Sequence, residues 1–138
     1  MLRIEKSGLT RYEITSDGRL LTVVEGRSGG QFRLDGTSYR IRRRFRTYQL
    51  LTADGSVLAS THRPGTRTWS VESGGSELRF RRTGRRDHAQ VDEAGNTVGT
   101  VAAGTADLSG VKPALQVFVL TALAMRSRRR RVVVVAGS

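Results

Sequence analysis

The chain has 138 residues, enough for one domain with a substantial core, and a formal net charge of +12. It contains no cysteine, which excludes a disulfide framework, a thiolate zinc site and a cysteine nucleophile. Lys6 and Lys112 are the only lysines, so the excess charge is carried by arginine, which attracts polyanions and anionic surfaces. Arginine-rich coding bias produces the same composition without any binding role, and both interpretations stay open.

The first hundred residues alternate between short β-prone runs and tight turns. Asp-Gly pairs at residues 17–18, 35–36 and 54–55 suit hairpin turns, because glycine adopts positive φ angles without steric cost. Runs punctuated by turns every 8–12 residues or so, roughly the spacing seen here, indicate an antiparallel sandwich or barrel. We predict strands at residues 2–5, 11–15, 20–25, 31–34, 38–43, 47–52, 57–62, 68–72, 77–82, 88–92 and 97–102.

A loop at residues 107–110 precedes the one convincing helix, which we expect at about residues 112–127. Its segment PALQVFVLTALAM begins with proline, which is well tolerated at the first helical position. Apolar side chains cover every side of the helix, and Gln116 and Thr121 lie too far apart to form a polar stripe, so the helix must be enclosed. A helix over residues 114–125 rises only roughly 18 Å, whereas a bilayer core is roughly 30 Å thick, so we expect no transmembrane span.

The enclosing structure is predicted to be a barrel. The interior of an eight-stranded barrel is filled by its own side chains, whereas a larger barrel needs an additional element inside it. A central helix is one known way to fill that space. We therefore predict a mainly β fold: a closed antiparallel β-barrel of about 12 strands around one C-terminal hydrophobic α-helix, as a single domain over residues 1–138. The tail VVVVAGS at residues 132–138 is β-prone, and either closes the barrel as its last strand or stays loose.

Three segments resemble the tubby C-terminal-like superfamily, which includes plant LURP-one-related proteins and phospholipid scramblases. YRIRRRFRTYQLLTADGSVLAS, at residues 39–60, is similar to the family's strand, basic turn, strand and Asp-Gly hairpin. AQVDEAGNTVGTV, at residues 89–101, resembles its repeated hairpin, and PALQVFVLTALAM resembles its buried helix. The resemblance covers nearly the whole chain and implies a twelve-stranded barrel with phosphoinositide or phospholipid association in some members. The chain lacks the cysteine-rich and proline-rich segments of scramblases.

Few residues could carry catalysis. His62 and His88 are the only histidines, and neither has metal-ligand spacing to another histidine. Asp17, Asp35 and Asp54 are occupied in turns, and the other carboxylates are scattered among arginines. No P-loop, GxSxG or dinucleotide fingerprint occurs. We expect a non-enzymatic protein with no catalytic residue, no metal site and no cofactor.

Fifteen arginines fall into three clusters, at residues 40–46, 79–86 and 126–131. If the strand continues, Arg40, Arg42, Arg44 and Arg46 share one face, while Tyr39, Ile41 and Phe45 share the other. Such rows on an outer barrel face would bind phosphates through charge-assisted hydrogen bonds. The third cluster also has a structural interpretation, because basic residues at a helix C-terminus complement the helix dipole. The anion-binding candidates are Arg40, Arg42, Arg44, Arg46, Arg79, Arg81, Arg126, Arg128, Arg129, Arg130 and Arg131.

The leading functional hypothesis is a non-enzymatic barrel that binds anionic phospholipid headgroups at a membrane surface or acts as an adaptor. The N-terminus shows no secretory signal, so we expect a cytoplasmic protein, peripheral at the membrane where it binds lipid. The alternative is a nucleic-acid-binding β-barrel module, for which exposed aromatic side chains are expected. A small-ligand carrier is disfavoured because the helix fills the lumen, and an arginine-rich exterior that binds nothing remains the simplest interpretation.

Overall fold

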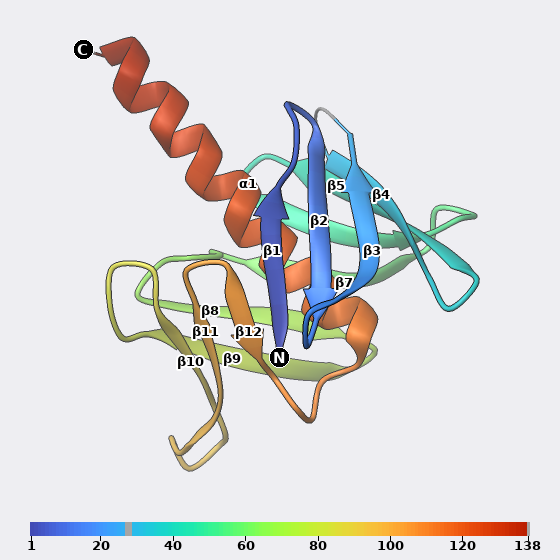
Figure 1. The fold of residues 1–138 in the computed structure, drawn as a ribbon. Coiled ribbons are helices and arrows are strands. Elements are labelled where there is room, and N and C mark those ends of the chain that lie inside the picture. The colour runs from blue at the N-terminus through green and yellow to red at the C-terminus, as the bar shows by residue number, and fades with distance from the viewer. Residues whose placement is uncertain (27–28, 138) are drawn as a thin grey trace.

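The twelve strands of the computed structural model form one closed antiparallel barrel, and helix α1 runs through it and out of one end (Figure 1). The structure describes residues 1–26 and 29–137, with side chains along α1 as far as Ser127. Neighbouring strands in the barrel are neighbours in the sequence, and β1 pairs with β12 to close it. The predicted closed barrel around a C-terminal helix is confirmed.

Each of the eleven predicted strands is present, with bounds within one or two residues of the prediction. Turn residues and two-residue alternation located them because both signals are local in the sequence. The strands are β1 (Leu2–Lys6), β2 (Arg11–Ser16), β3 (Arg19–Glu25), β4 (Gly29–Leu34), β5 (Thr37–Arg44), β6 (Thr47–Thr52), β7 (Val57–His62), β8 (Thr68–Ser73), β9 (Ser76–Arg82), β10 (His88–Val91), β11 (Thr97–Ala102) and β12 (Thr105–Asp107).

The barrel is closed by β12, a strand that was not among the eleven predicted. A two-residue turn ending in Gly104, with a φ of 79°, returns the chain from β11, and Ala106 then pairs with both Val101 and Leu2. The C-terminal residues 132–137, predicted to be either a last strand or a loose tail, are instead helical. Helix α1 (Pro113–Gly137) therefore begins where predicted and ends ten residues beyond residue 127.

The middle of α1 is enclosed by the barrel wall. Residues 117–122 are almost completely buried over more than one full turn, so every side of the helix contacts the interior. The two polar side chains in or next to this segment, Thr121 and Gln116, donate hydrogen bonds to nearby backbone carbonyls. Thr121 Oγ1 donates to the Val117 carbonyl at 2.7 Å, and Gln116 Nε2 donates to the Val111 carbonyl at 2.8 Å. These two side chains therefore need no polar partner from the strands.

Successive turns alternate between the two ends of the barrel, because each strand is antiparallel to the one before it. Strand β12 ends beside Leu2, at the end where β1 begins, and residues 108–112 lead from there into α1. Leu108 and Val111 of this connection are buried. We call this end the entry end and the opposite one the exit end; Figure 1 shows α1 leaving the barrel at the exit end.

Candidate functional site

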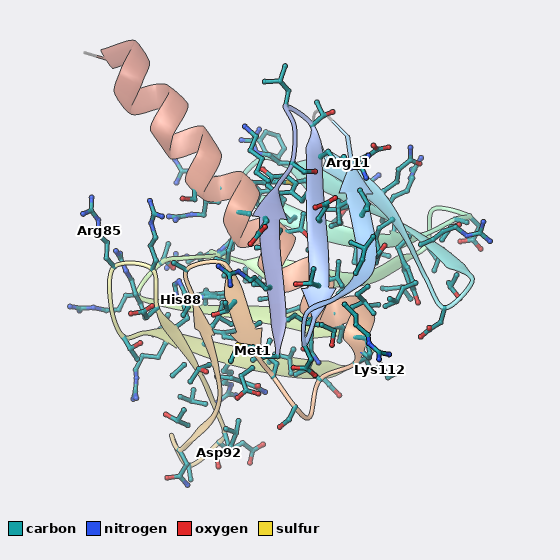
Figure 2. All side chains as sticks on the ribbon, viewed as in Figure 1. Met1, Arg11, Arg85, His88, Asp92 and Lys112 are labelled. Atoms are coloured by element: carbon teal, nitrogen blue, oxygen red, sulfur yellow. The ribbon has the colours of Figure 1, made fainter. Side chains whose placement is uncertain are left out.

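The described connections at the two ends of the barrel carry opposite charge. Connections at the entry end are residues 17–18, 35–36, 53–56, 74–75, 92–96 and 108–112, and those described at the exit end are 7–10, 45–46, 63–67, 83–87 and 103–104. The entry-end connections contain Asp17, Asp35, Asp54, Asp92, Glu93 and a single basic side chain, Lys112. The described exit-end connections contain Arg46, Arg63, Arg67, Arg85, Arg86 and a single carboxylate, Asp87. Figure 2 shows Arg85 on the side where α1 leaves, with Asp92 far from it.

The carboxylates at the entry end shape its turns. Asp92 Oδ1 accepts hydrogen bonds from the backbone N–H groups of Ala94, at 3.0 Å, and Asn96, at 2.8 Å. Asp54 accepts from the Thr52 hydroxyl and from the Ser56 N–H, and these hydrogen bonds, that from Thr52 foremost, lower the pKa of Asp54. Aspartate is favoured at such turns because its side chain bonds the backbone two residues on. The acidic end thus follows from the turn chemistry.

The exit end carries a continuous band of exposed arginines, which we call the basic arc. It spans three successive hairpins, β5–β6, β7–β8 and β9–β10, and therefore half of the twelve-stranded circumference. Within the part of the chain that the structure describes, no carboxylate lies at ion-pair distance from any of these guanidinium groups. The basic arc consists of Arg43, Arg44, Arg46, Arg63, Arg67, Arg82, Arg85 and Arg86.

In the described part of the opposite half of the exit end, carboxylates lie beside Arg11. Arg11 of β2 lies 3.9 Å from Glu13 and 3.7 Å from Glu25, nitrogen to oxygen. Exposed ion pairs of this kind stabilise the fold little, but they cancel the local charge. Among the described residues, the arginines without a carboxylate partner at the exit end therefore gather on the side of the basic arc.

Four of the predicted candidates lie on the walls of the barrel. Arg40 and Arg42 of β5 and Arg79 and Arg81 of β9 are exposed, while Ile41 and Phe80 between them are buried, so the predicted alternation is confirmed. Strands β6, β7 and β8 separate the two rows, which therefore form no common surface. Two of the four are engaged locally. Arg42 donates twice to Gln49 Oε1, at 3.1 and 2.6 Å, and Arg79 Nε donates to Glu77 Oε1 at 2.8 Å.

The strand does not continue to Arg46, so the alternating arginines of residues 40–46 do not form one row. Arg44 pairs with Thr47, so Phe45 and Arg46 form the two-residue turn of the β5–β6 hairpin. Phe45, which would face the core if the strand continued, is instead 85% exposed and has a φ of 57°. Closure of the hairpin overrode the alternation, because a tight turn points both of its side chains outward. Arg44 and Arg46 consequently belong to the basic arc.

Arg126 lies beneath the basic arc, where α1 leaves the barrel. A Cβ atom added at Gly65 would come within 2.6 Å of Arg126 Nη1, so the guanidinium packs against the β7–β8 connection. Glycine suits this buried position, which has a φ of 77°. Because α1 continues to Gly137 and has no basic residue in its last turn, the interpretation of the third cluster as a C-terminal dipole partner is wrong. The side chains of Arg128, Arg129, Arg130 and Arg131 lie outside the described residues.

Two arc residues, Arg63 and Arg67, belong to none of the predicted clusters. They flank the β7–β8 connection in the segment THRPGTRT, where they look isolated in the sequence. The barrel brings them between the β5–β6 and β9–β10 hairpins. The sequence did contain a signal that could have placed them. In an antiparallel meander every second turn lies at the same end, so the Asp-Gly turns mark the entry end and the turns that alternate with them, including residues 63–67, lie at the exit end.

His88 is buried under the basic arc as a structural residue. Its Nδ1 accepts a hydrogen bond of 3.0 Å from Trp69 Nε1, and Trp69 stacks on Phe80 with ring centroids 4.1 Å apart. Burial lowers the pKa of His88, the charges of Arg82 and Arg126 lower it further, and Asp87 opposes them. The imidazole is therefore held neutral, with its proton on Nε2.

Neutral His88 predicts an acid-labile fold. The pKa of His88 is lowered from 6.5 in the folded protein, so the unfolded chain binds the proton more readily. The contribution of neutral His88 to stability is therefore fully present above pH 6.5, and it is lost as the pH falls toward the pKa of the folded state. We expect the urea midpoint to drop between about pH 7.5 and about pH 5.5, and the drop to shrink in His88→Asn, which keeps an acceptor for Trp69. His62→Asn, the same change at an exposed histidine, should retain it. An identical pH dependence in His88→Asn would contradict this role.

Among the described residues, no three His, Cys, Asp or Glu side chains gather into a group that could hold a metal ion. No helix in the described part of the chain combines the length and apolar character needed to cross a bilayer. Comparisons with protein-family models, curated proteins and solved structures found no match to this chain. The resemblance to the tubby superfamily therefore stays a prediction.

Proposed function

We propose that this protein is a non-enzymatic barrel domain whose exit end binds the anionic surface of a membrane. The observation that carries the proposal is the basic arc: eight exposed arginines at one end of the barrel, with the acidic turns at the other. A molecule with this charge separation is oriented by the field of an acidic leaflet so that the exit end approaches first. Guanidinium groups then bind lipid phosphate oxygens through paired hydrogen bonds.

The aromatic residues favour a lipid partner over a nucleic acid. Non-specific single-strand binding combines basic grooves with aromatic side chains on which successive bases stack. This chain has eight aromatic residues, all of them described, and Phe45 is the one that is fully exposed. A single aromatic ring offers no stacking platform, whereas headgroup binding needs only the distributed charge of the arc.

The direct test is co-sedimentation with vesicles of phosphatidylcholine alone or with about one-third phosphatidylserine. We expect binding to the anionic vesicles only, and release when NaCl is raised from about 0.1 M to about 0.5 M, because salt screens exposed charges. Binding to neutral vesicles of equal strength, or no binding to either kind, would overturn the proposal.

Charge reversal locates the binding surface. The double variant Arg44→Glu with Arg86→Glu reverses the charge on two hairpins of the basic arc, β5–β6 and β9–β10. It should weaken binding by about 2–4 kcal/mol, roughly 30- to 900-fold, since each basic residue near an acidic leaflet contributes about 1 kcal/mol. The matched control is Arg19→Glu with Arg33→Glu, which alters the net charge equally but lies on strands β3 and β4 toward the entry end. Equal weakening by both pairs would show attraction to net charge alone. Loss of binding to a DNA oligonucleotide, with vesicle binding unchanged in every variant, would favour the nucleic-acid alternative.

A further inference from the structure

We infer that Phe45 penetrates the lipid surface as an apolar anchor while the surrounding arginines hold the headgroups, with Leu9 as a second, weaker contact. The inference rests on the proposed function and specifies how the exit end engages the bilayer. The partner is an anionic lipid bilayer, because an exposed ring flanked by exposed arginines matches a surface that is anionic outside and apolar beneath.

Phe45 occupies a position that neither packing nor backbone geometry explains. The ring is 85% exposed at the tip of the β5–β6 hairpin, and Arg43, Arg44 and Arg46 beside it are exposed as well. Its φ of 57° lies in the left-handed region, where glycine, asparagine and aspartate are common and a bulky side chain is not. The two-residue turns at 17–18 and 35–36 likewise have a positive φ at their first residue, and there that residue is aspartate. A large apolar residue here therefore indicates a requirement outside the folded barrel.

Leu9 lies at the same end of the barrel. It is 78% exposed in the β1–β2 connection, which is an exit-end turn like that of Phe45. The other exposed large apolar residues lie at the chain start or on strand segments that follow entry-end turns, where aspartates would be repelled by an acidic leaflet. These residues are Met1, Leu20, Val57, Leu58 and Val98. The exit end therefore presents both exposed apolar turn residues, and Phe45 lies beside arginines that have no carboxylate partner.

The two kinds of side chain act at different depths. Guanidinium groups pair with phosphates at the headgroup level, while a side chain at the hairpin tip reaches the boundary with the acyl chains, about 5–10 Å deeper. Coulombic attraction is screened by salt, but removal of apolar surface from water is not. Binding should accordingly contain a salt-sensitive part from the basic arc and a salt-resistant part from Phe45.

Insertion is tested by placing a fluorophore at the tip. In Phe45→Trp the introduced indole should shift its emission to the blue with anionic vesicles, and lipids with brominated acyl chains should quench it. The matched control is Leu20→Trp at the entry end, whose native side chain is 61% exposed, and its emission should not change. Trp69 is buried in the barrel and contributes a constant background in both variants.

A second variant separates insertion from charge. Phe45→Asn removes the ring but suits the positive φ, so the protein should unfold at an equal or higher urea concentration. Affinity for the anionic vesicles should fall roughly 5- to 30-fold, the loss expected for one largely buried aromatic ring, and the remaining binding should be more sensitive to salt.

The outcomes distinguish this inference from the proposed function. If Phe45→Trp shows neither a blue shift nor quenching while the vesicles still bind through the basic arc, insertion is refuted and headgroup binding stands. If neither wild-type protein nor variant binds anionic vesicles, both fail. A blue shift with a single-stranded oligonucleotide but not with vesicles would assign the ring to base stacking and overturn the inference.

Discussion

Leu120→Asp is expected to abolish folding. Leu120 is 2% exposed, on the buried stretch of α1 at the centre of the barrel, where no water can reach a carboxylate. Burying an unpaired charge there costs more than the 5–15 kcal/mol or so by which a typical domain is stable, unless the carboxylate is protonated. We expect insoluble protein, or a soluble chain with no cooperative urea transition by circular dichroism.

Leu20→Asp is the control for this change. It introduces the same charge at a leucine that is 61% exposed on β3, and should leave the free energy of unfolding within about 0.5 kcal/mol of the wild type. A folded, monomeric Leu120→Asp protein with a normal urea transition would mean that α1 does not occupy the barrel.

Phe118→Ala is expected to cost about 3–5 kcal/mol of the free energy of unfolding. Phe118 has no exposed surface, and it projects from the enclosed part of α1 toward the strands. Truncation leaves a cavity that a closed barrel cannot collapse around, because every strand is hydrogen-bonded on both sides. Urea denaturation should show a lower midpoint with an unchanged slope.

The matched substitution is Phe45→Ala, which deletes the same atoms from a ring that is 85% exposed. It should change the free energy of unfolding by less than about 0.5 kcal/mol, although it should weaken vesicle binding. Similar destabilisation by both substitutions would contradict the assignment of one phenylalanine to the core and the other to the surface.

The charge separation between the ends has a simple structural origin. Tight hairpins with positive φ at both central residues are at the entry end, where Asp-Gly occurs at residues 17–18 and 35–36. The exit-end connections 63–67 and 83–87 are longer than these two-residue turns and carry arginines, whose long side chains extend into solvent. The fold thus leaves one end free to carry charge that binds anions, while the other end uses its carboxylates for turn formation.

Local patterns in the sequence were sufficient to predict the elements and their broad arrangement. Asp-Gly turns and two-residue alternation placed the eleven strands from β1 to β11, and α1 was recognised as enclosed because Val117, Phe118 and Leu120 leave no polar side. Such signals depend on neighbours a few residues away, and the need to bury apolar surface converts them directly into a core. The closed barrel follows, because a helix apolar on all sides requires a complete wall.

Tertiary structure decided what closes the barrel and what the surface brings together. The three-residue strand β12 is too short for a periodic signal and exists because β1 and β11 both offer it hydrogen bonds. Arg63 and Arg67 join Arg44 and Arg86 only once all strands are paired, since the end at which a turn lies depends on every preceding strand. Phe45 is exposed because pairing of Arg44 with Thr47 ends the strand before it. Periodicity assigns a residue to a face, whereas pairing between distant segments determines its neighbours.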